Sequence, residues 1–188
     1  FGGAEIAPVC EAEVERACRA LRERGLTQVV VSGVFAPMRR EHEQRVAELV
    51  RRHVPGAQVT LSADVGRLGL LERENAAVLN AAIQPLARRT LLGFRAALRR
   101  RGLRCPLLLT QNDGTVAAAA DVLRTPVHAF ASGPTNSMRG AAFLSGQRDA
   151  IVVDVGGTTS AVGVLVGGFP QMSTATVRVG GVRTNFQM

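Results

Sequence analysis

The stretch IVVDVGGTTSAVGVLVGG, residues 151–168, decides the fold. It reads as an apolar strand that ends in an acid, followed by two glycines, three hydroxyl side chains, a second apolar strand and another glycine pair. Adjacent glycines between two strands are typical of a tight hairpin turn. We therefore expect an antiparallel meander with strands at residues 150–155, 160–166 and 169–179. Polar and apolar residues alternate along the third segment, as they do in a half-buried strand.

The first turn of this meander has the composition of a phosphate-binding loop. Gly156 and Gly157 leave the backbone N–H groups unobstructed, so that they can point at an anion. Thr158 and Thr159 add hydroxyl donors, and Asp154 is placed to hold a magnesium-bound water or to orient an attacking one. The alternative is an ordinary glycine-rich hairpin whose aspartate accepts hydrogen bonds from the turn. The paired threonines and the meander favour phosphate binding.

Before residue 147 the pattern is different, because helical and strand-like segments alternate. This alternation predicts an α/β domain with a largely parallel sheet. We expect helices at residues 11–24, 39–53, 71–101 (with a kink at Pro85), 116–123 and 136–144. We expect strands at residues 28–35, 105–110 and 127–130, and a short one after Pro55.

Composition narrows the chemistry. The chain has 188 residues, no lysine and a formal net charge of +8, which excludes a Walker-type phosphate lysine and a Schiff base. Ten arginines between residues 49 and 101 suggest nucleic acid, but Trp and Tyr are absent, so a solvated helix face is the favoured interpretation. Three cysteines without paired spacing indicate reduced thiols, and no apolar run is long enough to span a membrane. We expect a cytoplasmic protein that binds neither nucleic acid nor membrane.

Two further segments are candidates for a substrate or nucleotide cleft. Gln111, Asn112 and Asp113 follow a strand end, which is where open α/β sheets bind ligands. The alternative is a polar turn that uses Asn and Asp for backbone reasons. Ser132 and Gly133 precede the helix expected at 136–144 and would bring a helix N-terminus to an anion. Capping of that helix is the alternative, and we favour it.

Several spaced motifs resemble the hydantoinase and oxoprolinase family, of the hydantoin-utilisation A type. LLLTQNDGTV, ASGPTNSMRGAAFLSG and DAIVVDVGGTTSAVGVLVGGFP stand in the family's order. DVGGTTS is similar to the second phosphate hairpin of the superfamily of actin, sugar kinases and heat-shock chaperones. The resemblance implies that residues 1–147 are the α/β remainder of a first ribonuclease-H-like (actin-like ATPase) domain plus a connecting helix. Residues 148–188 would then open a second such domain and carry its phosphate hairpin.

The same resemblance implies an ATP-dependent hydrolase of cyclic amides or imides such as 5-oxoproline or hydantoins, with ATP and magnesium as cofactors. Its partners would be that small lactam or imide, the rest of a longer chain, and a hydantoin-utilisation B-type subunit or domain. The family's first phosphate hairpin would precede Phe1, so we expect the isolated chain to be an inactive fragment. Family members carry an acid where this chain has Ala161, which leaves open a catalytically silent nucleotide-binding or scaffold relative. The other alternative is a phosphotransferase such as a sugar kinase.

Overall fold

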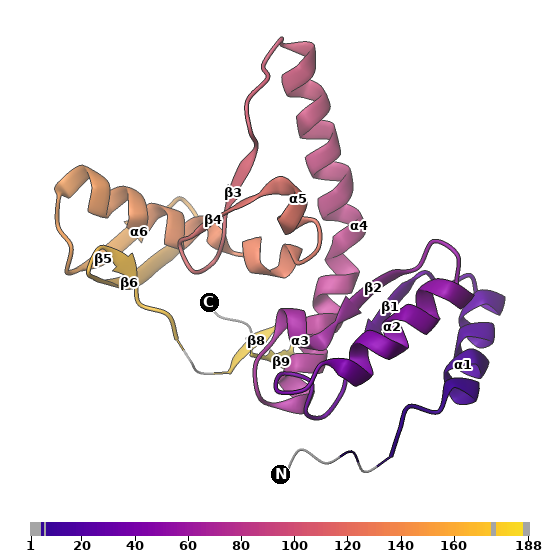
Figure 1. The fold of residues 1–188 in the computed structure, drawn as a ribbon. Coiled ribbons are helices and arrows are strands. Elements are labelled where there is room, and N and C mark those ends of the chain that lie inside the picture. The colour runs from indigo at the N-terminus through magenta and orange to yellow at the C-terminus, as the bar shows by residue number, and fades with distance from the viewer. Residues whose placement is uncertain (1–4, 6, 174–175, 186–188) are drawn as a thin grey trace. The chain divides into compact units, whose positions relative to one another are not determined.

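The computed structural model describes residue 5 and residues 7–173 and 176–185 (Figure 1). The chain divides into two compact units. One contains the residues up to Ala82 together with Arg178–Asn185, and the other contains Ile83–Val177. The long helix α4, Leu70–Arg100, contributes residues to both. Among the helices that the structure describes, none is long and apolar enough to cross a lipid bilayer.

The first unit is built on a two-stranded parallel sheet of β1 (Gln28–Val31) and β2 (Gln58–Leu61). Parallel strands need a crossover connection, and helix α2 (Glu41–His53) supplies it and packs on both strands. Helix α1 (Glu11–Glu23) packs on α2. The core between them contains Cys18, Val29, Val50 and Val54, and burial, reinforced by the nearby charge of Glu15, raises the pKa of the Cys18 thiol.

The short helix α3 (Ser62–Val65) follows β2, and a separate hairpin is formed by β8 (Val177–Val179) and β9 (Val182–Thr184). Its two turn glycines both have positive φ, as a two-residue hairpin turn requires. Asn75 Nδ2 of α4 donates a hydrogen bond to Arg183 O at 2.9 Å, and Asn185 Nδ2 donates to Leu68 O at 2.9 Å. The hairpin is therefore tied to the beginning of α4.

A buried polar network joins three helices of the first unit, and the sequence analysis did not anticipate it. Glu43 of α2, Ser62 of α3 and Arg73 of α4 are each at most 1% exposed. Glu43 Oε1 accepts hydrogen bonds from Ser62 Oγ at 2.5 Å and from Gly33 N at 2.8 Å. Arg73 Nε donates to Ser62 Oγ at 2.9 Å, and its terminal nitrogens donate to the carbonyl oxygens of residues 33, 34 and 67. Because both charged groups are fully hydrogen-bonded, the network fixes the loops around it.

The second unit begins with the latter part of α4, where Pro85 lies inside the helix without ending it. Strand β3 (Leu108–Thr110) pairs antiparallel with β4 (Val116–Ala118). Helix α5 (Ala119–Val122) and the 3-10 helix η1 (Pro126–Ala129) follow. Leu91 of α4 packs with Ala119 and Val122 in a small core.

The predicted meander is present in the second unit. Helix α6 (Ser132–Ser145) packs along one face of an antiparallel sheet of β5 (Ala150–Val155), β6 (Ser160–Val166) and β7 (Phe169–Pro170) (Figure 1). A Cβ at Gly163 would lie 2.1 Å from Met138 Sδ, so α6 approaches β6 as closely as glycine allows. The sheet is separate from that of β1 and β2, as predicted.

The opposite face of this sheet is apolar and, apart from Phe169, whose ring is contacted by Arg139 of α6, uncovered within the described residues. Cross-strand pairing puts Ile151 opposite Val164, Val153 opposite Val162 and Val166 opposite Phe169, so all six lie on one side. Their exposed fractions run from 46% at Val164 to 74% at Ile151. Monomeric proteins rarely leave such a contiguous apolar surface in water.

Several secondary-structure predictions are wrong, each for a local reason. Residues 127–130 do not form a strand, because Pro126 opens the 3-10 helix η1. The helix expected at 116–123 is reduced to α5, since residues 116–118 pair with β3 instead. Helix α6 begins at Ser132 rather than at residue 136, since Pro134 is tolerated in a first helical turn.

The extent and direction of the strands also differ from expectation. The third meander strand is only two residues long, and residues 177–179 belong to the β8–β9 hairpin. The strands expected at 28–35 and 105–110 are shortened to 28–31 and 108–110. Parallel pairing is confined to β1 and β2 among the strand pairs with a described register, so the sheet of the first part is not largely parallel.

Candidate phosphate-binding hairpin

The loop between β5 and β6 is a four-residue turn, Gly156, Gly157, Thr158 and Thr159, and all four residues are exposed. It is closed by one backbone hydrogen bond, from Gly156 N to Thr159 O at 2.9 Å. In the described part of the chain, the amides of the other three residues donate to no protein acceptor. They are therefore available to an anion.

The fold itself does not require glycine at position 157. Gly157 does not have a positive φ, and a Cβ there would meet no atom within 4 Å. An alanine would fit at this position in the free chain, so neither packing nor backbone conformation explains why residue 157 lacks a side chain. Close approach of a ligand to the backbone is one reason for glycine at such a position.

Asp154 is the last but one residue of β5, and its register partner is Ala161 of β6. Its side chain is exposed, and no hydrogen bond or ion pair to its carboxylate occurs among the described residues. The alternative that Asp154 serves the turn is therefore wrong. Residues 160–164 alternate between exposed and half-buried, which confirms that Ala161 and Gly163 share one side and Ser160 and Val162 the other.

The donors at this hairpin fit a magnesium–nucleotide complex. No group of three or more His, Cys, Asp or Glu side chains able to hold a metal occurs among residues that the structure describes. Magnesium does not need one, because it keeps several waters and is commonly held by one or two carboxylates together with substrate phosphates. Asp154 would be that carboxylate, and the turn amides and the hydroxyls of Thr158 and Thr159 would face the phosphate.

The segment Gln111–Gly114 is a tight turn between β3 and β4, closed by a hydrogen bond from Gly114 N to Gln111 O at 3.1 Å. Asp113 Oδ1 accepts hydrogen bonds from Thr115 N at 2.9 Å and Thr115 Oγ1 at 2.6 Å. Gly114 has a φ of 82°. Asp113 therefore has the backbone role that polar turns give to this residue type.

Asn112 differs from its neighbours because it is 4% exposed. Its backbone N–H donates to His128 O at 2.7 Å, and its carbonyl accepts from Thr135 Oγ1 of α6 at 2.9 Å. Its Nδ2 has no partner among the described residues. Through these backbone hydrogen bonds, Asn112 joins the β3–β4 turn to α6.

His128, whose carbonyl accepts from Asn112, has a perturbed imidazole. Burial lowers the pKa of His128, and the nearby charge of Asp113 opposes that shift without cancelling it.

Ser132 and Gly133 are the first two residues of α6, and the cap position before them is Ala131, with a φ of 58° and no side-chain capping bond. The interpretation of Ser132 as a cap is therefore wrong. Within the described residues, no hydrogen bond or ion pair joins either the 111–113 segment or these two residues to the 154–159 hairpin. The structure brings the hairpin residues together with one another and leaves the other candidates outside that group.

Arg139 has a role that sequence reasoning did not assign. Its guanidinium lies 4.2 Å from the ring centroid of Phe169 and donates to Gly168 O. This arginine fixes the β6–β7 turn to α6 by a cation–π contact and a hydrogen bond. The sequence signal was weak, because one arginine in a helix is usually a surface residue.

The fold of the chain is similar to that of two enzymes of known structure. The structure of acetone carboxylase matches with a TM-score of 0.74 over 97% of this chain and 26% of that chain, at 21% identity. The structure of ATP-dependent caprolactamase from Pseudomonas jessenii matches with a TM-score of 0.77 over 87% and 24%, at 28% identity. These matches confirm the predicted fold class, a mixed α/β structure that corresponds to part of an actin-like ATPase fold.

The chain belongs to the hydantoinase/oxoprolinase family. The family profile matches residues 73–188, and the profile of the family's N-terminal region matches residues 1–54. The gamma subunit of acetophenone carboxylase from Aromatoleum aromaticum is 30% identical over 174 residues, 87% of this chain and 23% of that protein. The alpha subunit of caprolactamase from Pseudomonas jessenii is 27% identical over 170 residues, 88% of this chain and 24% of that protein. The chain therefore spans about a quarter of the relatives it matches.

Proposed function

We propose that this chain is part of an ATP-dependent enzyme that hydrolyses cyclic amides or imides of the 5-oxoproline or hydantoin type. Family membership and the similarity to an ATP-dependent caprolactamase support the reaction class. The observation that carries the proposal is the β5–β6 turn, whose free amides and unobstructed Gly157 leave room for a phosphate group. Three free cysteines suit a cytoplasmic enzyme.

Each hairpin residue has a distinct part in this proposal. The amides of residues 157–159 and the hydroxyls of Thr158 and Thr159 hold the phosphate, while Asp154 holds a magnesium-bound water or orients the attacking one. When bound, ATP would supply the phosphoryl group for the amide oxygen of the ring, and this makes the ring carbonyl carbon a better target for water. The chain's contribution is to position that phosphate, which is an effect of orientation rather than of acid–base chemistry.

We also propose that residues 148–188 begin a second ribonuclease-H-like domain. The uncovered apolar face of β5 and β6 supports this, because a sheet with one bare face needs further elements to cover it. Those elements would belong to the rest of a longer chain or to a partner subunit of the hydantoin-utilisation B type. Two relatives are themselves subunits, of acetophenone carboxylase and of caprolactamase, which supports a partner chain.

Two other functions each have one supporting observation. Carboxylation of a ketone is supported by the 30% identity to an acetophenone carboxylase subunit. A catalytically silent nucleotide-binding scaffold is supported by Ala161, which puts a methyl group opposite Asp154. A sugar-kinase-like phosphotransferase would share the hairpin but has no relative among the proteins described above.

Backbone amide shifts in NMR spectra of the 188-residue chain test phosphate binding directly. Magnesium with ATP or tripolyphosphate should shift the amides of residues 157–159, and Asp154→Asn should remove the magnesium dependence. The Gly180–Gly181 turn is an internal control, because it is also an exposed glycine turn between strands. Equal shifts at both turns would refute a specific phosphate site.

Turnover separates the reaction classes. We expect the 188-residue chain alone to release no phosphate from ATP with 5-oxoproline or hydantoin, since catalysis needs both reactants held in one geometry. A longer polypeptide that contains this chain should open a cyclic amide. Carboxylation of a ketone with bicarbonate would favour the second candidate, and binding without turnover would favour the scaffold.

A further inference from the structure

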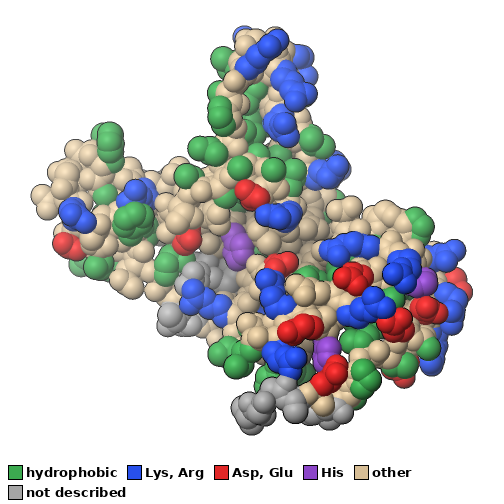
Figure 2. All heavy atoms as spheres, in the orientation of Figure 1, with side chains coloured by type: hydrophobic (Ala, Val, Ile, Leu, Met, Phe, Trp, Pro, Cys, Tyr) green, Lys and Arg blue, Asp and Glu red, His purple; other side chains and the backbone are tan. Residues whose placement is uncertain are grey.

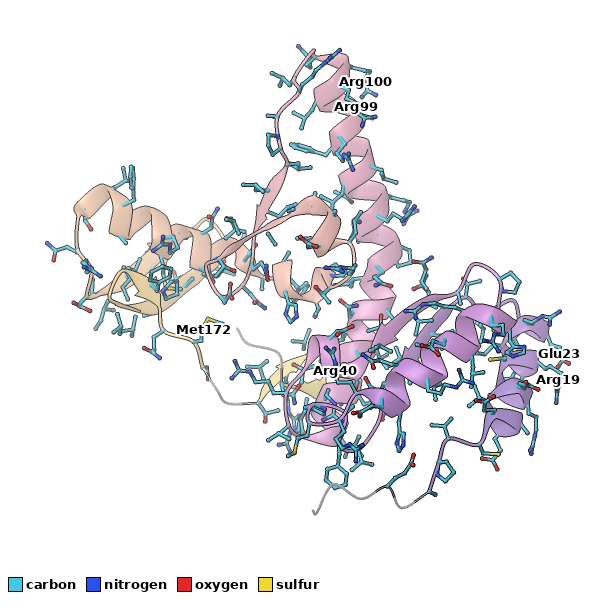
Figure 3. All side chains as sticks on the ribbon, viewed as in Figure 1. Arg19, Glu23, Arg40, Arg99, Arg100 and Met172 are labelled. Carbon is cyan, nitrogen blue, oxygen red and sulfur yellow. The ribbon has the colours of Figure 1, made fainter. Side chains whose placement is uncertain are left out.

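The C-terminal end of α4 and the loop after it form a strongly cationic surface. No acidic residue occurs between Glu74 and Asp113. Seven exposed arginines lie in that interval, and none of their side chains has an ion pair or hydrogen bond within the described part of the chain. They are Arg88, Arg89, Arg95, Arg99, Arg100, Arg101 and Arg104. Figure 2 shows blue side chains gathered over the end of α4, and Figure 3 labels Arg99 and Arg100 there.

This surface contrasts with two arginines of helix α2 and its N-cap, which have acidic partners. Arg40 forms an ion pair with Asp64, and Arg45 forms one with Glu11. Like charges gathered on one surface repel one another unless anions lie among them. The arginines of the α4 end have no such anion supplied by the described chain.

The cationic surface is also a groove with apolar walls. Helix α4 ends in a C-cap in which Gly102, at a φ of 73°, donates to Arg99 O at 3.0 Å, and Leu103 N donates to Leu98 O at 3.0 Å. The chain then folds back along the helix and encloses an open cavity of about 510 Å³. Its lining combines three arginines with apolar side chains and one cysteine: Arg95, Arg99, Arg104, Leu98, Leu103, Leu107 and Cys105.

A helix dipole does not account for this arrangement. It favours basic residues in the last turn by about 0.3–1 kcal/mol, which covers Arg99 and Arg100 only. It gives no reason for Leu103 to be 52% exposed beside them, or for Phe94 to be 53% exposed one turn earlier. Exposed apolar residues interleaved with unpaired arginines are typical of a binding surface.

We propose that this groove binds an acidic segment of a partner polypeptide that also carries leucine-like side chains. Carboxylates would pair with the guanidinium groups of Arg95, Arg99 and Arg104, and apolar side chains would pack on Leu98 and Leu103. Nucleic acid fits less well, because its backbone offers no aliphatic contact and the groove offers no Trp or Tyr for stacking. The proposal goes beyond the phosphate hairpin and does not depend on it.

A labelled peptide of alternating Glu and Leu residues is the probe, measured by fluorescence anisotropy on the 188-residue chain at low salt. Poly-glutamate of equal length and single-stranded oligo-dT are the comparison ligands. Reversing the charge in Arg95→Glu/Arg99→Glu/Arg104→Glu should weaken peptide binding by at least about tenfold. The matched control is Arg16→Glu/Arg19→Glu/Arg22→Glu on α1, which makes the same charge change on another exposed helix and should alter binding by less than about twofold.

Leu103→Ser tests the apolar part of the groove. It should weaken binding of the Glu–Leu peptide and leave binding of poly-glutamate unchanged. Three results would each overturn the proposal. They are an equal loss of peptide binding in the two triple variants, no measurable peptide binding by the unaltered chain, and tighter binding of oligo-dT than of the peptide. None of these measurements uses nucleotide, so their failure is distinct from failure of the phosphate site.

Discussion

Ala161 lies directly opposite Asp154 in the β5–β6 register, so Ala161→Asp would create a cross-strand pair of carboxylates. Directly opposed residues have Cβ atoms about 4.5–5.5 Å apart. Two negative charges about 5 Å apart repel by about 1 kcal/mol in water and about 3 kcal/mol at an effective dielectric constant of 20. Asp154 is exposed and Ala161 is half-buried, so we expect a destabilisation of about 1–2 kcal/mol.

Thermal unfolding of the variant, with and without magnesium, measures this effect. A loss of each kcal/mol should lower the Tm by about 2–4 °C for a chain of this size. Millimolar magnesium should restore most of the loss, because a divalent cation between two carboxylates removes their repulsion. In the context of a complete enzyme, the same substitution should raise magnesium-dependent ATP turnover, and Asp154→Asn should abolish it.

Ala161→Asn is the matched control, since it has the shape of Asp without the charge. It should be more stable than Ala161→Asp in the absence of magnesium and should not respond to magnesium. If Asn and Asp destabilise equally, and by about 3 kcal/mol or more, then position 161 is packed interior and the cost is that of burying a polar group. That result would refute the placement of Ala161 at the cation site.

Three further predictions concern stability. Glu43→Gln should cost about 3–5 kcal/mol by leaving Arg73 as an uncompensated buried charge, and Glu43→Gln/Arg73→Met should recover part of the loss in urea unfolding. Burial lowers the pKa of His128, so the folded state favours the neutral imidazole. The stability that this neutral side chain contributes is complete above about pH 6.5 and is lost as pH falls below that value. His128→Gln should therefore flatten the dependence of Tm on pH between about pH 5 and 7. Ala131→Gly should raise stability by about 1 kcal/mol, because it relieves a left-handed alanine, and a lower Tm would contradict this.

The hairpin was predictable from the sequence because its signals are local. A glycine pair fixes a turn, and alternation along residues 160–164 fixes which side chains share a face. The ends of α1 and α2 were predictable for the same reason, since their apolar residues recur with helical spacing. Composition did not decide the structure of residues 116–118, which we expected in a helix and which instead pair antiparallel with the neighbouring strand β3.

The buried network was not predictable in its partners, although one signal was present. Glu43 stands three and seven residues before Val46 and Val50, on the apolar stripe of α2. A charge on such a stripe indicates a buried partner, but the spacing does not identify Arg73, which is 30 residues further along the chain. Likewise, the sequence placed Gln111 and Asp113 at a strand end without showing that the turn would use Asp113 itself.

The contact between Gly163 and Met138 has a consequence for how the family can vary. With a Cβ at position 163 lying 2.1 Å from the methionine sulfur, the two positions cannot both carry a bulky side chain while α6 keeps its distance from β6. In an alignment of relatives, larger residues at the equivalent of 163 should appear together with shorter ones at 138, as co-varying pairs in contact do. The spacing between α6 and the strand that follows the phosphate turn would thus be inherited through a pair of positions rather than through either one alone.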